Sequence, residues 1–313
     1  MIDFTTQRNE GAIQLSACSS SFAESLESEE VICKVNNYVF VFCVSAVHVI
    51  LSLTSLIGNI LILIALHKVS SLHSSSKLLF RCLSCTDLIV GLFSQPIFVT
   101  YLMAFVNKNW DICELTESLA FVSGSILCGE SISTLTAISV DRLLSLVLGL
   151  RYRQIVTFTR IRLFVITSWL INVAFAMTYL WRKRLFFMGS CVILLLLLSI
   201  SSCCYLKIYA SLRRRQVQVH GSHINHGASL NIARYKKTVA SALWIYLTIL
   251  LCYLPYTIAT TVSAFYGVSP CNAIAWNISG ILVFLNSSLN PILYCWKIRE
   301  VKQAVKQTIR QCF

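Results

Sequence analysis

Seven long apolar segments constrain this chain more than any other feature of its sequence. A helix needs about 20 residues to cross the hydrocarbon core of a bilayer, which is about 30 Å thick, and each segment is long enough to do so. The segments lack the short-period alternation of apolar and polar residues that is typical of a membrane β-barrel. We therefore expect an all-α membrane protein, a seven-transmembrane helix bundle with spans near 38–66, 78–105, 113–146, 161–181, 185–212, 237–264 and 273–296.

Charge is scarce and unevenly placed along the chain. Only 12% of the residues are charged and 56% are hydrophobic, whereas soluble domains carry about 25% charged residues. Lys and Arg concentrate in every second connection, beginning with the first, and after the last segment. The positive-inside rule then places the N-terminus outside the cell and the C-terminus in the cytoplasm. This asymmetry accounts for most of the net charge of +13, so we infer no nucleic-acid partner from it.

The two ends of the chain differ from its apolar middle. Residues 1–37 are rich in Ser and acidic side chains, and we expect an extracellular tail without a cleaved signal peptide. Residues 38–296 would form the transmembrane domain. Residues 297–313 place Lys and Arg around an apolar stripe, which predicts a short amphipathic eighth helix on the inner leaflet and a short tail. Cys312 is a candidate for palmitoylation.

No motif for catalysis is apparent. The sequence has no Walker loop, zincin motif or Gly-x-Ser-x-Gly motif, so we do not expect an enzyme. It also lacks the paired, Gly- or Pro-broken helices that mark the two halves of many transporters. The histidines between 220 and 226 lie in a polar connection, and we interpret them as solvated spacer rather than as a metal site.

Ionisable side chains inside the apolar segments are the first candidates for function, because a charge at membrane depth is costly. Asp87 lies in the second segment and Glu130 midway along the third. Asp141 and Arg142 lie at the end of the third segment. Taken alone, this last pair is equally well explained as an ion pair at a helix end.

Six short motifs favour a functional role for this pair over a simple ion pair, because they occur in order and one per helix. They are GN at 58–59, LSCTD at 83–87, DR at 141–142, Trp169, CYLPY at 252–256 and NPILY at 290–294. Together they resemble the class A (rhodopsin-like) G-protein-coupled receptors. The resemblance covers the chain from about 38 to 312. It implies a plasma-membrane receptor for an extracellular ligand, with a heterotrimeric G protein, arrestin and membrane lipid as partners.

The resemblance also implies a polar centre that holds a sodium ion. A carboxylate inside the membrane needs a counter-charge, and a small cation with oxygen ligands would supply one. No other metal or cofactor is expected. The residues that match this centre are Asn59, Asp87, Ser131, Asn286 and Asn290.

A further implication is an activation switch. At rest, Arg142 would hold Asp141. When the sixth helix moves outward, Arg142 would turn toward Tyr205 and Tyr294, and Pro255 would provide the hinge in that helix. The residues that match this switch are Asp141, Arg142, Tyr205, Tyr253, Pro255, Pro291 and Tyr294.

Several positions depart from the family pattern. Tyr253 stands where most members have Trp, and Leu197 stands where most have a proline in the fifth helix. Tyr235 replaces an acid that pairs with the helix-3 Arg in many relatives, which predicts appreciable signalling without ligand. The connection at 181–184 has no Cys to pair with the top of the third helix. The missing proline in the fifth helix and the minimal connection at 181–184 resemble the melanocortin receptors, within the melanocortin, lysophospholipid, cannabinoid and adenosine cluster.

Cysteines on the outer side are candidates for a disulfide, because that side is oxidising. Cys18, Cys33, Cys113 and Cys271 lie there. Cys33 precedes the first helix and Cys271 lies between the sixth and seventh, so the two are neighbours in the implied bundle, and we favour this pair. We interpret the cysteines in or below the membrane as small packing residues.

Two positions argue against particular ligands. Gly124 stands where aminergic receptors have an Asp, and Phe284 stands where opsins have the retinal-binding Lys. A peptide or a small apolar, nucleoside-like or lipid-like ligand remains. Glu114 and Glu117 could receive a cationic peptide or be solvated surface. The implied pocket is aromatic and rich in small residues, which helix packing would explain equally well: Tyr101, Phe121, Gly124, Ser125, Cys128, Tyr256, Thr257, Thr260, Trp276, Gly280 and Phe284.

Two other functions are compatible with seven helices. A channel or transporter could use Asp87 and the buried asparagines as an ion path. A receptor-fold protein could have lost its coupling to G proteins, although the presence of Arg142 argues against this. The basic stretches 211–215 and 233–237 suit a docked G-protein helix and also anionic lipid headgroups.

Overall fold

In the residues that the computed structural model describes, seven helices are long and apolar enough to cross a membrane, and this confirms the predicted all-α, seven-helix fold. The structure describes residues 38–69, 73–221, 226–266, 270–297 and 299–312, and these ranges contain no β-strand. The side chains of Cys33, Cys271, Cys312 and Tyr235 lie outside the described part.

The helices follow one another through short connections. The first is Tyr38–Lys68. It is followed by α2 (Ser74–Ile89), the π-helical turn η1 (Val90–Ser94), α3 (Gln95–Val106), α4 (Trp110–Leu148), the 3₁₀ turn η2 (Gly149–Arg151), α5 (Tyr152–Ile155), α6 (Phe158–Trp181), α7 (Lys183–Gly221), α8 (His226–Tyr266), α9 (Pro270–Lys297) and α10 (Arg299–Cys312).

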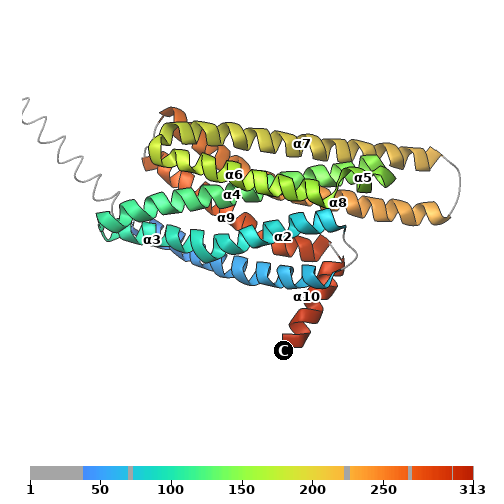
Figure 1. Ribbon diagram of the computed structural model, residues 1–313, viewed down its shortest axis with the longest axis horizontal. Coiled ribbons are helices and arrows are strands. Elements are labelled where there is room, and N and C mark those ends of the chain that lie inside the picture. The colour runs from blue at the N-terminus through green and yellow to red at the C-terminus, as the bar shows by residue number, and fades with distance from the viewer. Residues whose placement is uncertain (1–37, 70–72, 222–225, 267–269, 298, 313) are drawn as a thin grey trace, which may run out of the picture. The chain divides into compact units, whose positions relative to one another are not determined.

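The chain divides into two compact units, Met1–Ala46 and Val47–Phe313. Within the larger unit α4 is the central helix, in contact with α2, α3, α6, α7 and α9. The helix α7 packs along α8, and α8 packs along α9 (Figure 1). Leu135 of α4 lies in the main apolar core with Leu79 and Leu83 of α2. Because α4 touches most of the bundle, polar residues on it can reach partners on several helices.

The second span is not a regular α-helix. It passes from α2 through the π-turn Val90–Ser94 into α3, and Pro96 lies in the first turn of α3. Proline lacks a backbone N–H and clashes with the carbonyl four residues earlier, and a π-turn is one way to absorb this disturbance. Gly91 in the turn approaches the first helix closely, where the Ser52 hydroxyl donates to its carbonyl at 2.6 Å.

Local signals set both ends of α4. The Asn109 side chain caps its start by accepting from the backbone N–H of Ile112 at 3.4 Å. Gly149 ends it with φ +53°, in the left-handed region that glycine adopts without steric cost. At the other end of the chain, α10 buries Val301 and Val305 in the main core. This confirms the predicted eighth helix.

The first helix approaches α9 closely at Gly58. A Cβ atom at this position would lie 2.9 Å from Cγ of Pro291, which is a steric overlap. We predict that Gly58→Ala lowers the free energy of unfolding by about 1–3 kcal/mol, the usual cost of overpacking. Thermal unfolding of the purified protein in detergent would measure the change. Gly280→Ala is the control, since a Cβ there meets nothing within 4 Å. An equal effect of both substitutions would contradict the prediction.

Candidate functional site

A buried carboxylate, Asp87 of α2, joins three helices in the middle of the bundle. The Ser131 hydroxyl of α4 donates to Asp87 Oδ1 at 2.8 Å, and the Asn290 amide of α9 donates to Oδ2 at 2.7 Å. Both Asp87 and Ser131 are almost completely buried. Each carboxylate oxygen therefore has a donor from a different helix.

The other two members of the expected polar centre, Asn59 and Asn286, are buried, and no hydrogen bond among the described residues joins either of them to Asp87. The Asn59 amide donates to the Ser55 carbonyl at 2.9 Å and to the Ser287 carbonyl at 3.1 Å, so it joins the first helix to α9. Its Oδ1 has no hydrogen-bond partner among the described residues. Asn286 is also buried with both amide atoms unpartnered in the described part of the chain.

This donor set fits a small hard cation. The ligands available are a carboxylate, a hydroxyl and the amide oxygens of Asn59 and Asn286, and oxygen ligands are those that such cations prefer. In the described part of the chain, no Lys or Arg forms an ion pair with Asp87. The residues present thus have the chemistry to hold sodium, with Asp87 as the charged ligand.

At one end of the bundle, Asp141 of α4 is held by neighbours other than Arg142. The Ser76 hydroxyl donates to Asp141 Oδ2 at 2.9 Å, and the Tyr152 hydroxyl of α5 donates to Oδ1. Burial and the hydrogen bond to Asp141 raise the pKa of Tyr152 to about 12. Arg142 Nε lies 3.9 Å from Asp141 Oδ2, and the Arg142 side chain is 41% exposed. The expected hold of Arg142 on Asp141 is therefore loose.

Phe80 of α2 lies beside both Arg142 and Tyr294. The guanidinium Cζ of Arg142 is 5.5 Å from the centre of the Phe80 ring, and the Tyr294 ring packs edge-on against Phe80 at 4.9 Å. The Ser139 hydroxyl donates to the Tyr205 hydroxyl at 3.3 Å. Among the described residues, no hydrogen bond joins Arg142 to Tyr205 or Tyr294. Arg142 and Tyr294 thus lie on either side of Phe80 without a hydrogen bond between them.

Pro255 and Pro291 lie inside helices that continue past them. Pro255 is within α8 and Pro291 within α9. Tyr253, two residues before Pro255, is buried and lines an aromatic cavity within the bundle. It therefore connects that cavity to the hinge expected at Pro255.

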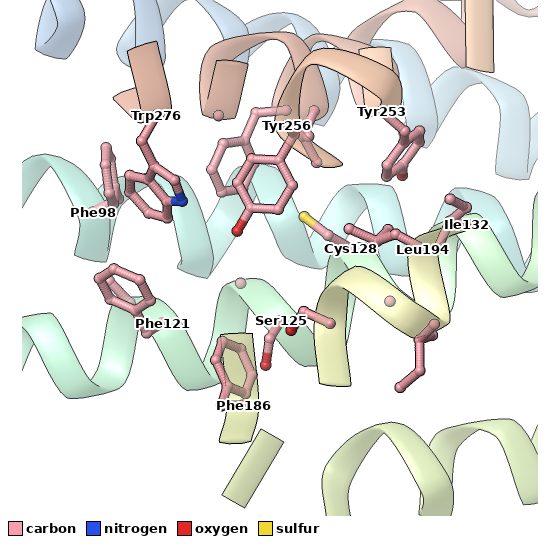
Figure 2. A pocket seen from close by; sticks show the side chains of 18 of the residues that line it. Phe98, Phe121, Ser125, Cys128, Ile132, Phe186, Leu194, Tyr253, Tyr256 and Trp276 are labelled. Atoms are coloured by element: carbon pink, nitrogen blue, oxygen red, sulfur yellow. The ribbon is translucent and has the colours of Figure 1, made fainter. Parts of the chain in front are cut away.

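A cavity lies among the first helix, α3, α4, α6, α7, α8 and α9 (Figure 2). Its wall is mainly aromatic and aliphatic, with Tyr253 and Tyr256 from α8 and Leu194 from α7. Eight of the eleven expected pocket residues line it: Phe121, Gly124, Ser125, Cys128, Tyr256, Trp276, Gly280 and Phe284.

The other three expected pocket residues, Tyr101, Thr257 and Thr260, are not part of the lining. Thr257 donates instead to the Tyr253 carbonyl of its own helix at 2.8 Å. Polar lining residues that sequence reasoning missed include His48 of the first helix and Asn172 of α6. An amide in the middle of an apolar span was a usable signal for Asn172, because polar groups at membrane depth are uncommon.

Aromatic rings stack across the Trp276 end of this cavity. The Phe121 ring is stacked on Trp276 at 5.1 Å and on Tyr179 at 4.7 Å. The Tyr179 hydroxyl donates to Glu117 Oε1 at 2.7 Å, and Lys183 Nζ lies 2.8 Å from the same oxygen. Glu117 is thus engaged by α6 and α7. Glu117 is therefore neither a surface residue without a protein partner nor an unpaired acid.

Comparison of the sequence with known proteins shows which family the chain resembles. A family model described as the seven-transmembrane receptor (rhodopsin family) matches residues 58–188 and 178–294. The chain is 25% identical to adenosine receptor A3 of Ovis aries, over 85% of this chain and 89% of that receptor. It is 26% identical to the histamine H2 receptor of Rattus norvegicus, over 84% of this chain and 78% of that receptor.

The hydrogen bond from Tyr152 to Asp141 gives a stability prediction. Tyr152→Phe leaves Asp141 Oδ1 buried without its donor, and this costs about 1–3 kcal/mol. With a pKa near 12, the Tyr152 phenol stays protonated at neutral and mildly alkaline pH, so the loss should be constant from about pH 7 to 9. Thermal unfolding across this range would measure it. Tyr209→Phe, at an exposed position of α7, should cost far less; equal costs would refute the assignment.

Proposed function

The chain belongs to the rhodopsin family of seven-transmembrane receptors, and we propose that it binds an extracellular ligand and activates heterotrimeric G proteins at the plasma membrane. The positive-inside asymmetry supports an extracellular N-terminus and a cytoplasmic C-terminus. The observation that carries the proposal is the placement of two sites on α4. Phe121 and Cys128 of α4 line the aromatic cavity. Arg142 lies near the end of the same helix, past the level of Asp87 and its partners.

The proposed mechanism is a population shift between two arrangements of the bundle. In the arrangement described here, Arg142 rests near Phe80 and Asp141, and Tyr246 of α8 is tied to Ser202 of α7 by a 2.8 Å hydrogen bond. Outward movement of this end of α8 would open a groove for a G-protein helix. Arg142 would then turn toward Tyr205 and Tyr294. A ligand favours this state only if it binds it more tightly.

We propose the cavity as the ligand site. Its aromatic lining suits a mostly apolar ligand with a few polar groups, and the chain resembles a receptor for adenosine and one for histamine. Gly124 gives the cavity no acid at the position that aminergic receptors use, so a nucleoside-like or other neutral aromatic molecule is favoured over a monoamine. Tyr253 links this site to the α8 hinge.

We further propose sodium as the resident ion at Asp87. Asn59, Ser131, Asn286 and Asn290 would complete its surroundings. A bound cation would supply the positive charge that the buried carboxylate lacks. The chain's own residues supply the rest, because Ser131 and Asn290 hold the carboxylate between α4 and α9.

Arg142 provides the direct test of coupling. Expression of the wild-type chain should raise G-protein activation above that of untransfected cells even without ligand, because Tyr235 replaces the acid of the usual lock. Arg142→Ala should abolish this activity while surface expression remains. Arg153→Ala, at an exposed position of α5, is the matched control. Full activity in Arg142→Ala would contradict the mechanism, and a current across liposomes containing only the purified protein would favour a channel.

The sodium proposal has a test that does not depend on signalling. Sodium chloride should raise the melting temperature of the purified protein relative to choline chloride, because a ligand that binds only the folded state stabilises it. Asp87→Asn should remove the difference. Glu130→Gln, which changes another buried acid of the same bundle, should retain it. A sodium effect that survives in Asp87→Asn would place the ion elsewhere.

A further inference from the structure

A second buried acid, Glu130 of α4, has no part in the switch or the sodium centre. It is fully buried. Its Oε1 accepts from the Ser168 hydroxyl at 2.8 Å, and its Oε2 accepts from the Asn172 amide nitrogen at 3.0 Å. Both donors belong to α6. An intramembrane carboxylate with two dedicated partners is a functional candidate by default.

These contacts fix which way the Asn172 amide points. Its Nδ2 donates both to Glu130 Oε2 and to the backbone carbonyl of Ser168, each at 3.0 Å. A carbonyl and a carboxylate oxygen can only accept here, so the reversed amide would set Oδ1 against two acceptors. The orientation also survives protonation of Glu130. Oε1 can carry the proton toward Ser168, whose own hydroxyl can donate to the Val165 carbonyl at 2.9 Å.

The remaining amide atom, Asn172 Oδ1, takes no part in these contacts. Asn172 and Gly129 both line the cavity. A Cβ on Gly129 would come within 2.5 Å of Oδ1, so the absence of a side chain on Gly129 makes room for this oxygen. Among the described residues, no hydrogen bond to Oδ1 is present. The neighbouring wall is aromatic, with Phe175 and Phe186 stacked at 5.3 Å.

We propose that Asn172 Oδ1 is a ligand-selecting hydrogen-bond acceptor, which favours aromatic ligands that carry an N–H or O–H donor. Glu130 is its positioning residue. The inference rests on the proposed function only in that the cavity is the ligand site. A ligand without a donor would cover Oδ1 and leave it desolvated and unpaired, and an unsatisfied buried group is costly.

Matched fragments test this selection without a known ligand. The probes are aminoquinazoline with methylquinazoline and aminoisoquinoline with methylisoquinoline, each pair substituted at one ring position. Amino and methyl groups have similar size, but only the amino group donates. Surface plasmon resonance on the immobilised full-length protein should show each amino form binding about tenfold more tightly, the effect expected for one buried hydrogen bond.

Four variants separate the roles of the residues. Asn172→Leu should erase the preference, and Gly129→Ala should reduce it by displacing Oδ1. Glu130→Leu should also reduce it. Glu130→Gln should preserve it, because Gln can turn its amide nitrogen to Ser168 and its oxygen to Asn172. A purely structural role for Glu130 would instead change the affinity for both members of a pair equally.

Three results would overturn the inference: equal binding of the paired fragments to the wild type, a preference that persists in Asn172→Leu, or no fragment binding at all. Basal G-protein activation measured on the same preparations separates this failure from failure of the proposed function. Coupling without fragment selection would refute only the role of Asn172. Selection without coupling would refute only the signalling role.

Discussion

A carboxylate buried in the middle of an apolar bundle is the constraint on which the rest of the structure depends. Asp87 is tolerated because Ser131 and Asn290 donate to its two oxygens, and leaving such a group unpaired would cost several kcal/mol. These bonds hold α2, α4 and α9 together at mid-depth. We propose that a change in the aromatic cavity reaches the Arg142 region through these bonded helices.

The central helix α4 is fixed by its acids at three further levels. Glu117 is bound by α6 and α7, Glu130 by α6, and Asp141 by α2 and α5. In the described part of the chain, no carboxylate ties α8 to a neighbour. Its polar contacts with α7 include hydrogen bonds between uncharged side chains, Tyr246 with Ser202 and Cys191 with Thr261. We therefore expect α8 to move more readily than α6, α7 or α9, each of which donates to a carboxylate of α2 or α4.

The sequence predicted the bundle well because membrane burial depends on long apolar runs, which are visible residue by residue. The approach of Asp87, Ser131 and Asn290 followed from the motifs they share with a family. Properties that depend on neighbours were not predictable. The π-turn at Val90–Ser94 is one of several ways in which a helix can accommodate Pro96, and the pairing of Glu117 with Lys183 needs the single-residue connection at Arg182. Tyr101 does not line the cavity, although the family resemblance implied it, because a matching position in the sequence does not determine the direction of the side chain.

We propose that a G protein binds when α8 moves away from α4 at the Arg142 end. Spin labels at Val147 of α4 and Leu247 of α8, both exposed, would report this distance by double electron–electron resonance in lipid nanodiscs. Nucleotide-free G protein should shift the distance distribution to longer values, and Arg142→Ala should prevent the shift. An identical distribution with and without G protein would contradict the proposal.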